Sequence, residues 1–246
     1  MFRALANDLP PPWEEIFGPL RVGSIDDLVV VGQIGQSLDG RTATRTGHSH
    51  YINGAPGLAH LHRLRALVDA VVVGADSALA DDPQLTVRRV AGPSPARVVL
   101  DPRGRLAPTA RLLADDGVRR LVVTAQGTRC ELPDVEILTL PAVDGQMAPA
   151  AILAGLADVG FRRVLIEGGP NTLSRFLAAG CLDRLHVVVA PIILGDGRSS
   201  FSLSPIDRVD QALRPPMRVH LLDGEVLFDC DFTAQRAPVW LAKKST

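Results

Sequence analysis

The stretch of residues 165–176, LIEGGPNTLSRF, carries the residue types best suited to hold an anion. A short apolar run ends at Glu167, and Gly168 and Gly169 permit close backbone approach. Pro170 suits the first turn of a helix, where no backbone N–H is required, and the free N–H groups there favour a phosphate. The pattern is weaker than a GxGxxG or GxxxxGK(S/T) motif, neither of which occurs in the chain, so a purely structural turn is an equal alternative.

A pair of aspartates, Asp81 and Asp82, follows another apolar run in residues 73–88, VGADSALADDPQLTVR. Two adjacent carboxylates suit acid–base chemistry or a metal, but aspartate equally often caps a helix or begins a turn. No third carboxylate or histidine arrives at a spacing that suits a metal, and none of the six histidines forms an HExxH motif. We therefore expect no metal site.

Two loop segments follow apolar runs and contain small and polar residues. Residues 37–52, SLDGRTATRTGHSHYI, begin with an Asp-Gly turn pair and form either a functional loop or a solvated connection. Residues 191–201, PIILGDGRSSF, place two glycines around an aspartate, which suits a plain turn or one wall of a nucleotide cleft. The residue pattern leaves both pairs of alternatives open.

Arginine is the residue type that binds phosphate in a bidentate manner, and Arg65 and Arg88 lie in or beside these segments. A solvated surface role is the default alternative for any one arginine. The three cysteines are far apart and form no CxxC pair, so neither a disulfide framework nor a zinc site is indicated. There is also no GxSxG nucleophile motif.

The elements that position these segments are predicted from apolar periodicity. A continuous run of apolar, β-branched residues is typical of a strand buried on both faces of a sheet. The chain contains seven such runs: LVVVGQIGQ, AVVVG, ARVVLD, RRLVVT, VEILTL, RRVLIEGG and RLHVVVAPIIL. Helix-like stretches lie between several of them, which predicts an α/β fold with a mostly parallel sheet flanked by helices. Ligands gather at the carboxyl ends of such strands. Residues 217–232 hold two further runs around Asp223-Gly224, which predicts a C-terminal antiparallel hairpin.

The bulk composition excludes several classes of protein. The 246 residues carry a net charge of −1, so no electrostatic footprint for nucleic acid or an anionic membrane is present. No stretch is apolar enough to span a bilayer, and the N-terminus does not resemble a signal peptide, so we expect a cytoplasmic protein. We interpret residues 1–27, which contain three consecutive prolines, as an extension, and residues 28–246 as one domain.

Six segments together resemble, in order and rough spacing, the reductase domain at the C-terminal end of the bifunctional riboflavin-biosynthesis deaminase/reductase. They are SLDGRTAT, GHSHYI, LRALVDAVVVGADSALADDPQLTVR, RVVLD, IEGGPNTLSRFL and APIILGDG, and the resemblance extends from about residue 28 to residue 205. It implies a dihydrofolate-reductase-like fold, NADPH as the cofactor, and 5-amino-6-(5-phosphoribosylamino)uracil as the substrate. The ribosyl group of that substrate would be reduced to a ribityl chain.

By position, the resemblance implies two adjoining sets of site residues. The substrate-binding residues would be Ser49, Arg65, Leu85, Arg88 and Glu167. The cofactor-binding residues would be Gly35, Tyr51, Ser77, Asp81, Gly168, Gly169, Pro170, Asn171, Thr172 and Leu173. Arg65 and Arg88 are candidates to clamp the 5′-phosphate. Asp81 and Glu167 are the catalytic candidates, Glu167 to bind the pyrimidine or a hydroxyl and Asp81 to position the nicotinamide or relay a proton through water.

The chain also departs from the family pattern. Gln33 stands where the family often has lysine, Tyr51 where tryptophan is frequent, and Ser77 where threonine is frequent. The H-x-E and P-C-x-x-C zinc motifs of the deaminase are absent, so we expect either a separate deaminase partner or another substrate. The resemblance further implies a homodimer. Two alternatives stay open: a related NADPH reductase of a pterin or dihydrofolate, and a non-enzymatic nucleotide-binding regulator.

Overall fold

The computed structural model describes residues 12–21, 27–50 and 52–238. The helices in these ranges are α1 (Trp13–Phe17), α2 (Ala55–Leu67), α3 (Ala75–Asp81), α4 (Pro149–Asp158) and α5 (Pro170–Ala178). The strands are β1 (Val29–Ser37), β2 (Arg41–Thr44), β3 (Ala70–Gly74), β4 (Ala96–Leu100), β5 (Arg120–Ala125), β6 (Glu136–Leu140), β7 (Arg163–Ile166), β8 (Arg184–Ala190), β9 (Gly197–Ser199), β10 (Met217–Leu222) and β11 (Glu225–Asp231). Each of the seven predicted apolar runs forms a strand.

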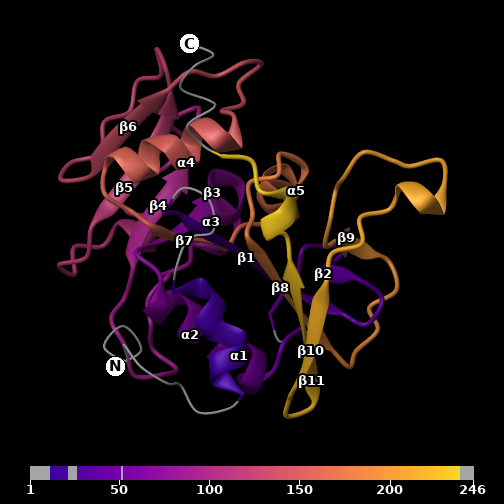
Figure 1. Ribbon diagram of the computed structural model, residues 1–246. Coiled ribbons are helices and arrows are strands. Elements are labelled where there is room, and N and C mark those ends of the chain that lie inside the picture. Colours follow the sequence, from indigo (N-terminus) through magenta and orange to yellow (C-terminus); the bar gives the residue numbers. More distant parts are fainter. Residues whose placement is uncertain (1–11, 22–26, 51, 239–246) are drawn as a thin grey trace.

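A nine-stranded sheet, as far as the described residues show it, organises the molecule in the order β10-β11-β8-β1-β7-β3-β4-β5-β6. The strands from β8 to β6 pair in parallel, and β10 and β11 add an antiparallel hairpin at one edge (Figure 1). The hairpin turns at Asp223 and Gly224, whose φ angles are +47° and +92°. These values suit the tight turn that an Asp-Gly pair favours. The predicted fold class is confirmed.

Two apolar layers hold the sheet between helices. On one face, α4 and α5 pack their leucine, isoleucine and phenylalanine side chains against the even-numbered valines of β1 and β3. On the other face, α1, α2 and α3 cover Val29, Val31, Val71 and Val73 (Figure 1). Burial of this kind provides the main favourable term in folding. No helix in the described part of the chain is both long and apolar enough to cross a membrane.

The short helix α1 begins directly after Pro12 and anchors its segment to the domain. Ile16 and Phe17 are completely buried, and the ring of Phe17 stacks on His60 of α2 at 5.4 Å between centroids. This apolar pair therefore packs as part of the core. The prolines at positions 10 and 11 lie outside the described residues.

The polar segment between β1 and α2 contains an element that apolar periodicity does not predict. The short strands β2 and β9 pair as a separate antiparallel two-stranded sheet. Asp39 accepts hydrogen bonds from the hydroxyl of Ser37 and from the N–H groups of Leu194 and Gly195 in the loop before β9. These bonds, the one from Ser37 first, lower the pKa of Asp39 to about 2. In Figure 1 the small sheet lies beside β8 and the hairpin.

Candidate functional site

A cleft of about 510 Å³ opens at the carboxyl ends of β1, β3 and β7. Residues from five segments of the chain line it, and they include Gln33, Gly35, Thr42, Ser49, Ser77, Asp81, Leu85, Glu167, Gly168, Gly169, Pro170 and Arg198. The cleft therefore lies where ligands gather in an open α/β sheet. Three segments that are far apart in the sequence therefore line one cleft: residues 37–52 after β1, residues 73–88 with the aspartate pair, and the glycine pair Gly168 and Gly169.

Two further cavities continue from this cleft. The second, about 490 Å³, shares Ser77, Gly169, Pro170 and Arg198 with the cleft. The third, about 130 Å³, shares Gly74, Asp76, Asn171 and Thr172 with the second. The start of α5 thus borders all three hollows, with Gly169 and Pro170 on the first two and Asn171 and Thr172 on the second and third. Adjoining hollows of this kind suit an elongated ligand.

The start of α5 is built for close approach to these hollows. Gly169 is the residue before the helix and donates its N–H to the Ser77 hydroxyl at 2.9 Å. The N–H groups of Asn171 and Thr172 are in the first turn, where a helix supplies no acceptor. A Cβ on Gly74 would come within 2.5 Å of the Thr172 hydroxyl, and one on Gly168 within 2.8 Å of its Cβ. Glycine at these two positions therefore leaves room for the side chain of Thr172.

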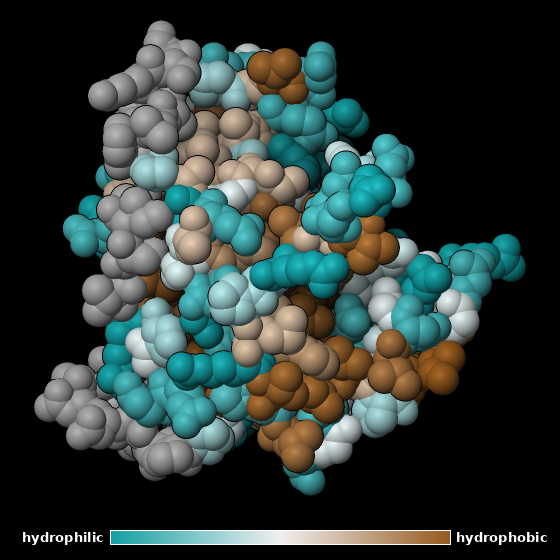
Figure 2. All heavy atoms as spheres, turned by 45° about the vertical axis from the view of Figure 1, so that its right-hand side comes forward, coloured by the Kyte–Doolittle hydropathy of each residue, from teal (hydrophilic) through white to brown (hydrophobic). Residues whose placement is uncertain are grey.

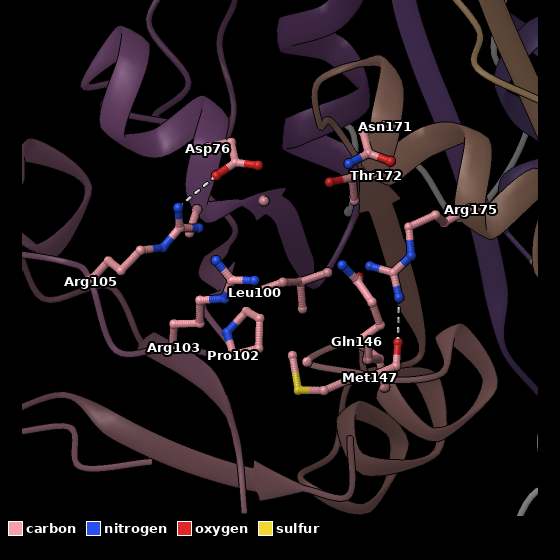
Figure 3. A pocket seen from close by; sticks show the side chains of 14 residues that line it. Asp76, Leu100, Pro102, Arg103, Arg105, Gln146, Met147, Asn171, Thr172 and Arg175 are labelled. Carbon is pink, nitrogen blue, oxygen red and sulfur yellow. Dashed lines mark hydrogen bonds and ion pairs between the residues drawn. The ribbon is translucent and has the colours of Figure 1, made fainter. Parts of the chain in front are cut away.

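The third cavity has three arginines on its wall (Figure 3). Arg175 donates to the carbonyl of Met147 at 2.7 Å, and Arg105 lies 2.8 Å from the Asp76 carboxylate. Arg103 is exposed, and among the described residues its guanidinium has no hydrogen-bond or ion-pair partner. Arg103 and Arg105 come from the loop after β4 and Arg175 comes from α5, and Gln146 lies among them in Figure 3. This wall therefore carries positive charge that suits a phosphate group.

Glu167 extends from the end of β7 and forms a two-point ion pair with Arg65 of α2. Arg65 Nε donates to one carboxylate oxygen at 2.7 Å, and Nη2 donates to the other. The third donor of the guanidinium, Nη1, reaches the carbonyl of Thr86 at 2.9 Å. The Arg65 side chain is only 6% exposed. Arg65 thus holds the carboxylate of Glu167 in one orientation at the cleft wall.

Leu85 presents the Thr86 carbonyl to Arg65 through an unusual backbone conformation. Its φ is +56°, in the left-handed region that a leucine rarely adopts, and its side chain is buried against the cleft. Such strain costs on the order of 1–3 kcal/mol and persists where the surrounding structure requires it. The segment between α3 and β4 is therefore shaped to serve the Arg65–Glu167 pair.

Arg88 lies in a cluster of positive groups next to this pair. Burial and the nearby charges of Arg65, Arg89 and Arg111 lower the pKa of Arg88, and Glu167 opposes that shift. Arg88 donates a side-chain N–H to the Thr86 hydroxyl at 3.2 Å. A cluster of guanidinium groups with a single carboxylate attracts anions.

His62 of α2 lies close to the same positive charges, those of Arg65 and Arg88. Its side chain is buried, and its Nδ1 accepts the backbone N–H of Arg88 at 3.0 Å. Burial, followed by the charges of Arg65 and Arg88, lowers the pKa of His62 to about 4. The imidazole is therefore neutral at neutral pH, as its acceptor role requires.

We expect His62 to make the fold sensitive to acid. Its folded pKa of about 4 lies below the ordinary value of 6.5, so the unfolded chain binds the proton more tightly. The stabilising contribution is complete above pH 6.5 and is lost as the pH falls towards 4, by about 2–3 kcal/mol. In urea unfolding at several pH values, His62→Asn should reduce this loss, whereas His48→Asn in the exposed loop should not. An unchanged profile in His62→Asn would contradict the assignment.

Gly35 allows the loop after β2 to cross β1 closely. A Cβ at this position would come within 1.7 Å of Asn53 Oδ1. Asn53 is not free to move, because its Nδ2 donates to Glu225 Oε1 at 2.8 Å and to the Val188 carbonyl at 3.2 Å. Glu225 in turn accepts the N–H groups of Gly54 and Gly57 at the start of α2. The position of Gly35 therefore requires a residue without a side chain, because any Cβ would overlap Asn53.

Gly35→Ala should consequently destabilise the protein by about 2–4 kcal/mol, since it displaces Asn53 and weakens the bonds to Glu225. Gly54→Ala is the matched control, because its nearest neighbour would be 3.5 Å away and its φ is −77°. Thermal unfolding of both variants measures the difference. Equal midpoints for Gly35→Ala and the natural protein would show that the loop adjusts freely.

Residues 29–223 match the family model described as the RibD C-terminal domain. The chain belongs to the RibD C-terminal domain family.

Relatives of this family differ in length. The chain is 33% identical over 205 residues to the 2,5-diamino-6-ribosylamino-4(3H)-pyrimidinone 5′-phosphate reductase of Methanothermobacter thermautotrophicus, covering 80% of this chain and 94% of that protein. It is 33% identical over 184 residues to the riboflavin biosynthesis protein RibD of Aquifex aeolicus, covering 73% of this chain but only 50% of that protein. Among solved structures, Acinetobacter baumannii RibD aligns with a TM-score of 0.70 at 32% identity, over 83% of this chain and 58% of that one. The chain thus spans about half the length of the RibD proteins it matches.

The positions inferred from the family resemblance fall into four groups in the structure. Gly35, Ser49, Ser77, Asp81, Leu85, Glu167, Gly168, Gly169 and Pro170 line the cleft, and Asn171 and Thr172 line the two cavities beyond it. Arg65 and Arg88 are not among the residues that line the cleft; Arg65 is paired to Glu167, and Arg88 is exposed and donates to Thr86. Leu173 is buried in the core, and its N–H is bonded to Gly169 within α5. Tyr51 lies outside the described residues.

Several cleft and cavity residues of this RibD-family chain were not singled out as site residues from the sequence. They are Gln33 on β1, Thr42 on β2, Arg198 on β9, and the arginines Arg103 and Arg105 of the third cavity. Arg198 belongs to the GDGR turn interpreted as one possible cleft wall, which was the available signal. The other arginines looked like ordinary surface residues.

Proposed function

We propose that this chain is an NADPH-dependent reductase that converts the ribosyl group of 5-amino-6-(5-phosphoribosylamino)uracil, or of the closely similar diaminopyrimidinone, into a ribityl chain. The observation that carries the proposal is the row of three adjoining hollows around the start of α5. At one end of it lies the cleft with the Arg65–Glu167 pair, and at the other lies the arginine-lined cavity. The pyrimidinone phosphate reductase among the relatives supports the choice of substrate.

The residues present fit a dinucleotide. The N–H groups of Asn171 and Thr172 would hold the diphosphate at the start of α5, beside Ser77 and Gly169. The third cavity would receive the adenosine end, where Arg103 and Arg105 would bind the 2′-phosphate that distinguishes NADPH from NADH. When bound, the nicotinamide would supply a hydride.

The substrate step requires an open-chain imine at C1′ of the sugar. C1′ accepts the hydride, the C1′–N double bond becomes single, and the nitrogen takes a proton. Glu167, held by Arg65, would accept a hydrogen bond from the pyrimidine or a sugar hydroxyl and fix the distance between the reacting atoms. Asp81, at the exposed end of α3 on the cleft rim, would position the nicotinamide edge or relay that proton through water.

The 5′-phosphate would be drawn to the positive cluster around Arg88. Arg65 is largely committed to Glu167 and Thr86, so Arg88 is the guanidinium better placed to make a direct phosphate contact. Arg89 and Arg111 add to the field. Arg65 would contribute its charge and the orientation of Glu167.

The direct test is an assay of NADPH consumption by the purified protein with the phosphoribosylaminopyrimidine. Substrate-dependent loss of NADPH, with NADH a much poorer donor, is the expected result. Tight NADPH binding without turnover of this substrate or its diaminopyrimidinone relative would instead favour a nucleotide-binding regulator. Turnover of dihydrofolate or a pterin alone would favour the other alternative.

We also infer that the protein forms a homodimer through the edge hairpin. Met217, Val219 and Leu221 project from the edge strand β10 and are 53%, 56% and 83% exposed. Figure 2 shows the face that contains the hairpin, with hydrophobic side chains gathered in its lower part. Exposed apolar edge strands commonly require covering.

The double substitution of Val219 and Leu221 by lysine should therefore shift the protein from dimer to monomer in sedimentation experiments. The like charges would oppose pairing across a symmetric interface. Lysine at Ile137, a 39%-exposed residue of the opposite edge strand β6, is the control and should leave the dimer intact. A monomeric natural protein, or a dimer that survives the hairpin substitutions, would contradict this inference.

A further inference from the structure

Arg198 is a positively charged residue that borders both the cleft and the second cavity. It lies on β9, it is exposed, and it is the only arginine or lysine among the described residues that line either hollow. Its backbone carbonyl accepts the Thr42 hydroxyl at 3.4 Å, but within the described part of the chain its guanidinium has no hydrogen-bond or ion-pair partner. A free guanidinium beside a ligand cleft is suited to bind an anion.

The pairing of β9 with β2 directs the Arg198 side chain towards the cleft. Arg198 lies opposite Ala43, and the side chains of opposed residues share one face of an antiparallel pair. Ala43 is only 1% exposed and lines the cleft. The close approach of the two strands depends on Gly197, where a Cβ would come within 2.2 Å of the Ala43 carbonyl oxygen. The side chain of Arg198 is therefore placed by its backbone.

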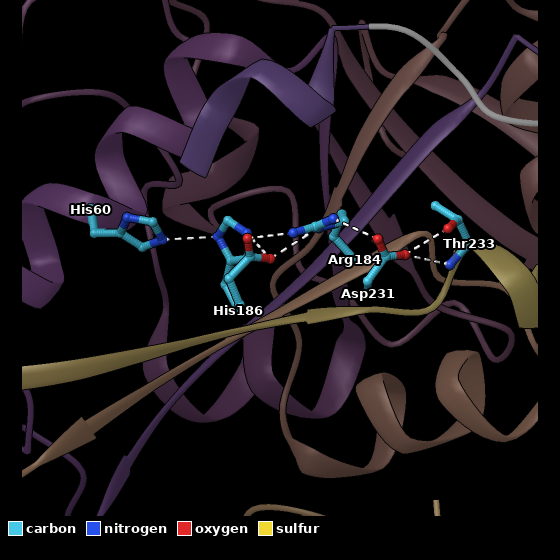
Figure 4. A network of polar contacts seen from close by, with 6 residues as sticks. His60, Arg184, His186, Asp231 and Thr233 are labelled. Atoms are coloured by element: carbon cyan, nitrogen blue, oxygen red, sulfur yellow. Dashed lines mark hydrogen bonds and ion pairs between the residues drawn. The ribbon is translucent and has the colours of Figure 1, made fainter. Parts of the chain in front are cut away.

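The loop that leads to β9 starts from a strand that buried polar contacts fix in place. On β8, His186 Nδ1 lies 3.0 Å from His60 Nε2 of α2, and His186 Nε2 lies 3.2 Å from Asp229 Oδ1 of β11 (Figure 4). Further along, Asp39 accepts two backbone N–H groups of the loop itself. The backbone that carries Arg198 is thus attached on both sides, while its guanidinium is available to a ligand.

The second cavity that Arg198 borders also carries an excess of positive charge. Asn171 and Thr172 at the start of α5 line the same cavity, and the free N–H groups of a helix start carry partial positive charge. Asp76 is the one carboxylate among the described lining residues, and Arg105 pairs with it at 2.8 Å. This balance of charge suits a diphosphate better than a neutral base or sugar.

We propose that Arg198 binds the diphosphate group of the nicotinamide dinucleotide, together with the N–H groups at the start of α5. The inference rests on the proposed function and adds a residue of the β2–β9 sheet to the cofactor site. NADPH and NADH share the diphosphate, so Arg198 contributes to the binding of both. Its role therefore differs from that of Arg103 and Arg105, which concerns NADPH alone.

The test compares Arg198→Ala with Arg208→Ala in fluorescence titrations of NADPH and NADH. Arg208 follows β9 in the same segment, is 73% exposed, pairs with Asp210, and lines neither hollow. For Arg198→Ala we expect the Kd of both dinucleotides to rise about tenfold, as for the loss of one charge-assisted hydrogen bond at an exposed residue. Arg198→Lys, which keeps the charge, should recover part of the affinity, and Arg208→Ala should leave both constants unchanged.

Titration with ribose 5-phosphate shows which anion Arg198 binds, and its Kd should be the same in Arg198→Ala as in the natural protein. Unchanged dinucleotide constants, weaker binding of NADPH alone, or weaker binding of ribose 5-phosphate in place of the dinucleotides would overturn the proposal. Equal weakening of all three ligands with a lower thermal midpoint would also overturn it, because it would indicate a purely structural role. Dinucleotide binding without turnover of the pyrimidine would reject only the proposed function, so the two failures are separable.

Discussion

Glu167→Gln should lower kcat/KM for the phosphoribosylaminopyrimidine by about a hundredfold to a thousandfold. The substitution removes one of the two acceptor oxygens and the charge that Arg65 is buried against. An amide nitrogen facing the guanidinium would also turn the side chain away from its present orientation. Removing one partner of a buried pair costs about 3–5 kcal/mol, so the thermal midpoint should fall as well.

A matched pair on the surface separates these effects from a general loss of ion pairing. Arg119 and Glu136 form the same two-point contact at 2.8 and 2.7 Å, but their side chains are 45% and 48% exposed. Glu136→Gln should change stability by less than about 1 kcal/mol and leave kcat/KM unchanged. If Glu167→Gln behaves like Glu136→Gln, Glu167 has no role at the site.

Replacement of Arg103 and Arg105 by alanine should raise the Kd for NADPH by about a hundredfold and leave the Kd for NADH nearly unchanged. Each guanidinium would contribute a charge-assisted hydrogen bond of about 1.5–3 kcal/mol to the 2′-phosphate. Arg103→Ala alone should produce a large part of the effect, because Arg105 already shares its charge with Asp76. Fluorescence titration of the reduced cofactors measures both constants directly.

Arg129→Ala is the control for this experiment. Arg129 is 85% exposed, its side chain pairs with Glu131, and it does not line the third cavity. Its loss should leave both cofactor constants unchanged. Equal weakening of NADPH and NADH by the double substitution would mean that the arginines hold a feature common to both cofactors, which would contradict the 2′-phosphate assignment.

The parallel sheet and the edge that carries the cleft were predictable because the information is local. Each buried strand is a continuous run of valine, leucine and isoleucine, and the start of α5 is marked by adjacent glycines and a proline. Asp223-Gly224 marked the hairpin turn in the same way. These features depend on residues within a few positions of one another.

The pairing within the site was not predictable, because it depends on contacts between distant segments. Arg65 and Glu167 are 102 residues apart, so the sequence could name each of them without showing that they bind each other. The strands β2 and β9 contain four and three residues, too few to show a periodicity. Arg103 and Arg105 line a cavity whose other walls come from distant segments, the residues around Met147 and around Asn171.

The most direct test of the reductase assignment follows the transferred hydrogen itself. NADPH carrying deuterium in the hydride position of its nicotinamide should be mixed with the protein and the phosphoribosylaminopyrimidine, and the product analysed by mass spectrometry and NMR. The account predicts a ribityl product with one deuterium at C1′. Unchanged ribosyl substrate, or a ribityl product without deuterium at that carbon, would contradict it.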